Sequence, residues 1–142
     1  MPDNKNINSE LKYSITDAEW KIMKILWKDS SHSLTCGEIF QALKSDTSWN
    51  YNTVRTLLVR LAEKNIVGME KRPGQNKNYD YNAMAKEEDC AIQETKSLLE
   101  RVFGGSTSLL FSTLIKNGGI SPEEQEEILQ VIESMKAGSE KK

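Results

Sequence analysis

The chain has 142 residues, 37% of them hydrophobic, a length that suits one or two small domains rather than a large enzyme. Its formal net charge is −2, so the protein as a whole is not a polycation. It has no run of about 18 apolar residues for a membrane span, no signal-peptide core, and only two widely separated cysteines, which argues against a disulfide framework. We therefore expect a cytoplasmic protein without membrane insertion.

The charge is distributed unevenly along the chain. Residues 1–82 carry 12 Lys and Arg against 10 Asp and Glu, whereas residues 83–142 carry 7 against 11. Residues 50–78 are the most basic stretch, with six basic side chains and two acidic ones. Because the local field governs docking, a basic patch on an acidic protein can still bind a polyanion.

The first predicted helix begins after a polar stretch, residues 1–14, which we expect to form a flexible arm. Thr16-Asp17-Ala18-Glu19 has the form of a capping box, in which the threonine and glutamate side chains each bind a backbone amide of the first turn. The helix is expected to reach about Lys28. Its tryptophans, Trp20 and Trp27, lie on one face and are predicted to join the core.

Two further helices follow in the next 35 or so positions. Thr35-Cys36-Gly37-Glu38 repeats the capping-box pattern and begins a short second helix, which ends before a turn at residues 45–48. The third helix is predicted within residues 49–67, with Asn50 as its N-cap and Asn65 suited to a left-handed C-terminal position.

The third helix has two contrasting faces. Its apolar residues recur at i, i+3, i+4 and i+7 and predict a buried stripe: Val54, Leu57, Leu58 and Leu61. The opposite face and its shoulders carry amide, hydroxyl and guanidinium groups, namely Asn52, Thr53, Arg55, Thr56 and Arg60, with Val59 among them. Such groups can read base edges and bind phosphates in a major groove. The alternative for this face is an ordinary solvated surface.

Two segments of alternating pattern, residues 67–71 and 79–81, predict a pair of strands joined by a turn-rich, basic tip. The order helix-helix-helix-strand-strand predicts a winged helix whose third helix enters the major groove. The basic residues of the hairpin, Lys71, Arg72 and Lys77, would then reach flanking phosphates. The hairpin on its own would fit a solvated β-turn equally well.

The remainder of the chain predicts three more helices, at residues 84–103, at 106–116, and from Ser121-Pro122-Glu123-Glu124 onward. So small a module rarely buries enough apolar surface alone, so we expect it to form a dimer. The alternative is a monomer in which these helices fold back onto the first domain. The predicted dimer contacts are Leu98, Leu99, Val102, Phe103, Leu110, Phe111, Leu114, Ile128, Leu129 and Ile132.

The expected architecture is therefore mainly α-helical. A flexible arm (1–14) precedes an N-terminal winged-helix DNA-binding domain (15–82), a three-helix C-terminal dimerisation domain (83–137) and a tail (138–142). A two-fold dimer of this kind would require a palindromic operator in double-stranded DNA.

The sequence offers no catalytic chemistry. Its one histidine, His32, lies in a polar connector, and there is no spaced His/Cys cluster, no Ser-His-Asp set and no glycine-rich phosphate loop. The acidic run at residues 123–127 falls in the first turn of a helix, where it compensates the dipole. No enzyme activity, metal or cofactor is predicted.

Four stretches of the sequence resemble the penicillinase-repressor family of bacterial transcriptional repressors, the BlaI/MecI/CopY type. These are ITDAEWKIMKILW (15–27), NTVRTLLVRL (52–61), YDYN (79–82) and SPEEQEEI (121–128). The resemblance implies a dimeric winged-helix repressor that binds a short inverted repeat in a promoter and controls genes of the β-lactam-resistance type. It places the positions of Asn52, Thr53, Arg55, Thr56 and Arg60 in the recognition helix.

The chain departs from close relatives at the recognition helix. Tyr51-Asn52 stands where those relatives often have Pro-Lys, and Val59 replaces a polar residue found in some of them. An exposed valine there could touch a thymine methyl group. We therefore expect a different operator preference. A family regulator that answers another signal, and a winged-helix module that binds a protein partner, remain as alternatives.

The resemblance also implies two modes of induction. In the β-lactam branch a membrane sensor-protease triggers cleavage at an Asn-Phe bond, but Ser112-Thr113 occupies the matching position here, and a relocated site at Leu110-Phe111 stays open. In the copper branch a CxCxxxxCxC motif binds metal, but no cysteine follows Cys90, so this mode is not expected.

Overall fold

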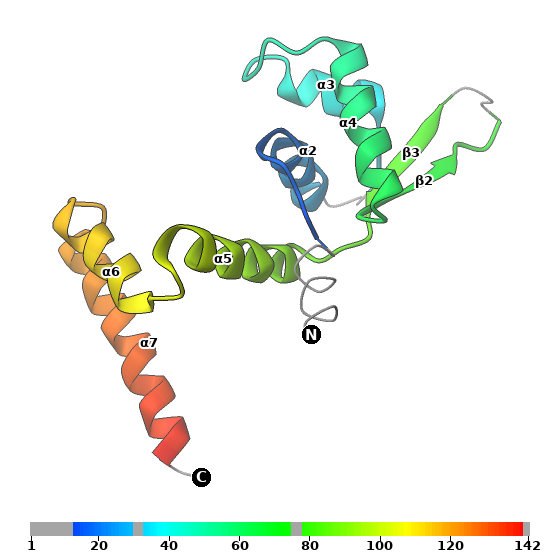
Figure 1. The fold of residues 1–142 in the computed structure, drawn as a ribbon. Coiled ribbons are helices and arrows are strands. Elements are labelled where there is room, and N and C mark those ends of the chain that lie inside the picture. Colours follow the sequence, from blue (N-terminus) through cyan, green and yellow to red (C-terminus); the bar gives the residue numbers. More distant parts are fainter. Residues whose placement is uncertain (1–12, 30–32, 75–77, 141–142) are drawn as a thin grey trace, which may run out of the picture. The chain divides into compact units, whose positions relative to one another are not determined.

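The computed structural model describes residues 13–29, 33–74 and 78–140, which form six helices and three strands. The chain divides into two compact units, Met1–Ser97 and Leu98–Lys142, so helix α5 contributes residues to both (Figure 1). The domain limits drawn from the sequence stay a prediction.

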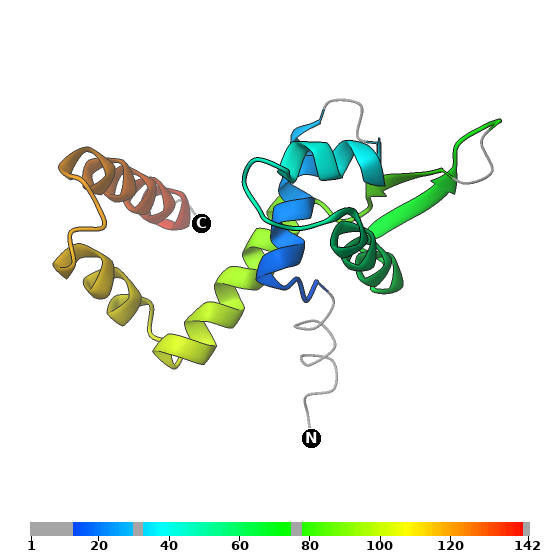
Figure 2. The same cartoon turned by 90° about the horizontal axis from the view of Figure 1, so that it is seen from above.

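The first unit is a winged helix, as predicted. Its elements in chain order are α2 (Asp17–Lys28), β1 (Leu34–Thr35), α3 (Cys36–Leu43), α4 (Tyr51–Glu63), β2 (Val67–Lys71), β3 (Tyr79–Ala83) and the first part of α5 (Glu87–Phe103). The three helices α2, α3 and α4 cluster together, and the β2–β3 hairpin projects from them in both views (Figures 1 and 2).

The sheet has one strand more than the sequence predicted. Its order is β1-β3-β2 and both pairings are antiparallel, with Leu34 opposite Tyr81 and Met69 also opposite Tyr81. Strand β1 has only two residues, too few for an alternating pattern to reveal it. Because β1 runs directly into α3, it ties the start of that helix to the wing.

The predicted helix caps are present. In the capping box of α2 the Thr16 amide donates to Glu19 Oε1 at 2.9 Å and the Glu19 amide donates to Thr16 Oγ1 at 3.2 Å. The box of α3 repeats this geometry with Thr35 and Glu38, at 2.8 and 3.2 Å. Asn65, just after α4, has φ 63°, the left-handed conformation that its position predicted.

The core of this unit is formed by the apolar faces of α2, α3 and α4 with the inner residues of the sheet. All four residues of the predicted stripe on α4 are buried: Val54, Leu57, Leu58 and Leu61. Trp20 and Trp27 pack against this core but are only partly buried. The indole N–H of Trp27 donates to the backbone oxygen of Ala85 at 3.0 Å, which fastens α2 to the segment before α5.

One charged residue lies within this core. The Glu19 side chain is 1% exposed, and its Oε1 accepts a hydrogen bond at 2.7 Å from Lys64 Nζ, at the C-terminal end of α4. Lys64 Nζ also donates to the backbone oxygen of Ser14 at 2.9 Å. A buried carboxylate needs such partners, since an unpaired charge in an apolar interior is strongly unfavourable.

The second unit contains the end of α5, then α6 (Thr107–Lys116) and α7 (Pro122–Glu140). Gly104 and Gly105, both with positive φ, follow α5. Ser121 caps α7 reciprocally with Glu124, both hydrogen bonds being 3.1 Å. The helix continues to residue 140, past the point at which the sequence suggested a tail.

In the described part of this single chain the second unit has no buried core. None of the described residues from 98 to 138 is buried. Among the predicted dimer contacts, the half-buried residues are Leu98, Leu99, Phe103, Leu110, Phe111 and Ile128, and the exposed ones are Val102, Leu114, Leu129 and Ile132. The three helices have apolar faces but enclose no interior, so these side chains lack the burial that normally stabilises a domain.

Across the described residues, every helix is too short or too polar to traverse a lipid bilayer.

The buried ion pair predicts a large stability effect at Lys64. Lys64→Met should lower the free energy of unfolding by about 2–3 kcal/mol, because Glu19 would keep a buried charge without its cation. A third of the Lys64 side chain is exposed, which holds the loss below that of a fully buried pair. Urea denaturation followed by circular dichroism measures it.

Lys24→Met provides the matched control. Lys24 pairs with Glu87 at 2.6 Å, but the two side chains are 61% and 47% exposed, so its loss should be under about 1 kcal/mol. Equal losses for the two variants would refute a special role for the buried pair.

Candidate nucleic-acid interface

The N-terminus of α4 is held by Asn50. Its Oδ1 accepts the Thr53 amide at 2.9 Å and the Thr53 hydroxyl at 3.1 Å. This cap stabilises the first turn of α4, which carries residues predicted to read bases. Since the Thr53 hydroxyl proton is directed to Asn50, that hydroxyl presents its remaining lone pairs, and therefore an acceptor, to a partner.

One flank of α4 brings together four of the predicted contact residues. Asn52, Thr53, Thr56 and Arg60 line a shallow hollow of about 390 Å³ with Asn50 and Leu57. Asn52, Thr56 and Arg60 are exposed, and no carboxylate of a described residue pairs with Arg60. An amide, a hydroxyl and a guanidinium on adjacent turns form a row of the type that reads base edges.

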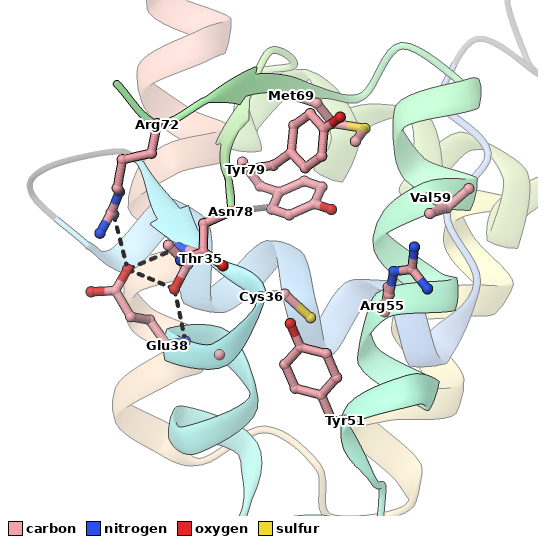
Figure 3. Close-up of a pocket in the computed structure, with 12 residues that line it drawn as sticks. Thr35, Cys36, Glu38, Tyr51, Arg55, Val59, Met69, Arg72, Asn78 and Tyr79 are labelled. Atoms are coloured by element: carbon pink, nitrogen blue, oxygen red, sulfur yellow. Dashed lines mark hydrogen bonds and ion pairs between the residues drawn. The ribbon is translucent and has the colours of Figure 1, made fainter. Parts of the chain in front are cut away.

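The other flank of α4 turns toward the wing. Arg55 and Val59 leave the helix on the side of a cavity of about 400 Å³ that α4 shares with α3 and the hairpin (Figure 3). Tyr51, at the first turn, lies on the same side and packs edge-on against Phe40, with ring centroids 6.1 Å apart. The structure thus divides the predicted contact residues between two flanks of one helix.

The basic residues of the wing differ in their pairing. Arg72 Nη2 donates to Asp80 Oδ1 at 2.7 Å and lies 3.6 Å from Glu38 Oε1, and the bond to Asp80 raises the pKa of the guanidinium. Lys71 is exposed and forms no ion pair with a described residue. Lys77 lies outside the described residues.

Arg72 therefore connects three elements. Its guanidinium is bonded to Asp80 on β3 and lies near Glu38 on α3. Glu38 in turn accepts the amide of Thr35 from β1, and Figure 3 shows the contacts of Glu38 with Arg72 and Thr35. A cation that already has two carboxylate neighbours adds little net charge toward a phosphate. Its ion pairs instead link the hairpin to α3.

Sequence reasoning did not identify the tyrosines of this site. Tyr79 and Tyr81 are two apart on β3, so period-two alternation places them on one face of the sheet, and both line the cavity. Cys36 lies beside them: burial raises the pKa of its thiol, which shares a hydrogen bond with the Tyr51 hydroxyl. These residues come from β3, α3 and α4, which only the tertiary fold brings together.

The segment considered for proteolysis lies in the middle of α6. Leu110, Phe111 and Ser112 are half-buried and Thr113 is exposed, with its hydroxyl donating to the Leu109 oxygen at 2.7 Å. A peptide bond within a helix is hydrogen-bonded at both ends, so cleavage there would require local unwinding.

Comparison with known proteins identifies the relatives of this chain. A family model described as penicillinase repressor matches residues 15–134. Methicillin resistance regulatory protein MecI of Mammaliicoccus sciuri is 27% identical over 120 residues, covering 84% of this chain and 94% of that protein. The penicillinase repressor of Staphylococcus aureus is 30% identical over 118 residues, with coverage of 83% and 90%.

A solved structure is also similar. The solution structure of Bacillus licheniformis BlaI in its monomeric form, in complex with the blaP half-operator, is 30% identical, covers 54% of this chain and 87% of that one, and gives a TM-score of 0.44. With the family model matching most of its length, the chain belongs to the penicillinase repressor family.

Proposed function

We propose that this protein is a cytoplasmic DNA-binding transcriptional repressor, without enzyme activity, that binds a palindromic promoter operator as a homodimer. The observation that carries the proposal is the exposed polar and basic face of α4 beside a wing, in a family whose members are named as repressors. A helix presented in this way fits the major groove of B-DNA, with a hairpin beside it to reach the backbone.

The two flanks of α4 and the wing suggest a division of roles. We assign base-edge contacts to Asn52, Thr56 and Arg60, which share one hollow, and an acceptor role to Thr53. Lys71, exposed and unpaired with any described carboxylate, is assigned to a backbone phosphate. Arg72 is assigned to the position of the wing, because Asp80 and Glu38 already balance its charge.

The proposed dimer follows from the second unit. Its described residues include no buried side chain, while Leu129 and Ile132 of α7 are 51% and 43% exposed. A second copy of the same surface would cover these side chains, as closed two-fold dimers do. Two recognition helices related by that axis would then read two half-sites of an inverted repeat.

The nature of the controlled genes has two candidates. Family membership supports regulation of β-lactam-resistance-type genes. The second candidate is a family regulator that answers a different signal, and a specific observation favours it: the position of the family's cleaved bond holds Ser112-Thr113, inside helix α6.

The assignment of Arg60 to a base edge gives a direct test. Arg60→Ala should weaken binding to a duplex selected by the wild-type protein from a random library by about 1–3 kcal/mol, roughly 5- to 150-fold. Gel-shift titration measures the change. Arg60→Lys keeps the charge but loses the planar pair of donors, so it should restore little of the affinity. Wild-type affinity in the alanine variant would contradict the docking model.

The two basic residues of the wing should differ in their salt dependence. In the proposed dimer, Lys71→Ala removes two phosphate contacts, so the slope of log Kobs against log salt should become shallower by about two. Arg72→Ala should leave the slope as it is, because Asp80 and Glu38 neutralise that cation. Fluorescence anisotropy at several salt concentrations measures both slopes, and equal changes would refute the distinction.

Charge introduced on α7 should separate the proposed dimer. Leu129→Glu places a carboxylate in the interface and is expected to give monomers in sedimentation equilibrium, with weaker operator binding. Gln130→Glu, which adds the same charge at an exposed polar position of α7, should remain dimeric. A wild-type protein that sediments as a monomer would exclude the dimer.

A further inference from the structure

A cavity lies between α3, α4 and the hairpin, and the base contacts assigned to Asn52, Thr56 and Arg60 do not involve its lining. Its volume, about 400 Å³, lies within the range of sites that hold small molecules, roughly 300–1,000 Å³. The residues that matter for its chemistry are Tyr51, Arg55, Val59, Met69, Tyr79 and Tyr81.

The two cations of the lining differ in their pairing. Arg55 forms no ion pair with a described residue, whereas Arg72, the other cation of the lining, is bonded to Asp80. Glu38 is the one carboxylate of the lining and lies 3.6 Å from Arg72. The Arg55 guanidinium is therefore available to an anion, and its planar donors suit a carboxylate.

The lining also contains the hydroxyl of Tyr81. Tyr81 is 4% exposed, yet its hydroxyl forms no hydrogen bond with any residue that the structure describes. In the described part of the chain, every polar side-chain atom that is fully shielded from solvent has a hydrogen-bond partner. The Tyr81 hydroxyl has none, so it is accessible to solvent, and we place it at the cavity that Tyr81 lines. Burial raises the pKa of Tyr81, which keeps the group protonated and able to donate.

Besides its polar groups, which include those of Thr35, Glu38 and Asn78, the lining presents flat rings and apolar side chains. The rings of Tyr51 and Tyr79, the thioether of Met69 and the side chain of Val59 surround the space between the helix and the wing (Figure 3). Aromatic rings and a polarisable sulfur pack well against a planar aromatic group. The contact of Tyr51 with Phe40 holds one of these walls in position.

We propose that this cavity binds a small aromatic carboxylate, with its carboxylate on Arg55 and the Tyr81 hydroxyl and its ring between Tyr51, Tyr79 and Met69. The bound anion acts as an inducer: it neutralises Arg55 and occupies the space between recognition helix and wing. DNA and the anion then exclude one another, and each lowers the affinity for the other by the same factor. This second step rests on the proposed repressor function, but the binding step does not.

The binding step is tested on the full-length protein without DNA. Titration with benzoate, followed by two-dimensional NMR, should shift resonances of cavity residues, and benzamide, the neutral analogue, should bind about tenfold more weakly. Tyr81→Phe removes only the hydroxyl and should weaken benzoate by a similar factor. Equal affinity for benzoate and benzamide in the wild-type protein overturns the proposal, whether or not any variant folds.

Two further measurements separate this proposal from the repressor function. Arg60→Gln, on the other flank of α4, should lose operator affinity and keep the wild-type Kd for benzoate. Tyr81→Phe should bind the operator as the wild type does, yet release it only at about tenfold higher benzoate. Tighter binding of inorganic phosphate than of benzoate, or weaker operator binding by Tyr81→Phe alone, would identify a DNA-phosphate pocket and overturn the proposal.

Discussion

The carboxylate of Glu19 makes two contacts, one of which joins α2 to the recognition helix. Its Oε1 accepts the Thr16 amide, which begins α2, and the Lys64 ammonium, which ends α4. The same lysine holds the Ser14 backbone oxygen. Apolar packing between α2 and α4 has no strong directional preference, whereas a buried ion pair defines one register. This contact links α2 to the C-terminal end of α4, the end away from Asn50.

The opposite end of the same surface is fixed by a second set of charges. Asp80, Arg72 and Glu38 connect the hairpin to α3, and strand β1 adds backbone bonds to β3. The helix and the wing are thus positioned by different contacts, one buried and one partly exposed. A ligand in the cavity contacts the wing, which is held by partly exposed ion pairs. Displacing the wing therefore requires less free energy than breaking the buried pair of Glu19 and Lys64.

Local patterns were sufficient to predict the winged helix. The caps at Thr16, Thr35 and Asn50, the stripe on α4 and the hairpin all follow from residues within a few positions of one another. The sequence did not reveal β1, because two residues carry no periodicity, nor the pairing of Arg72, because several carboxylates were available to it. The cavity was also missed, since its walls come from three segments that only tertiary packing brings together.

The second unit also has a feature that its sequence patterns do not determine, namely how its apolar side chains are buried. Its helices and their caps follow from sequence, but within the described residues of one chain they enclose no core. In the proposed dimer, a second copy supplies the missing burial. In a dimer, the two winged helices act on one operator, and the second contact benefits from a high effective concentration. An anion that disables one protomer removes this gain as well as the contacts of that protomer. A weakly bound small acid could therefore release the whole dimer, which makes a modest cavity sufficient for a regulatory switch.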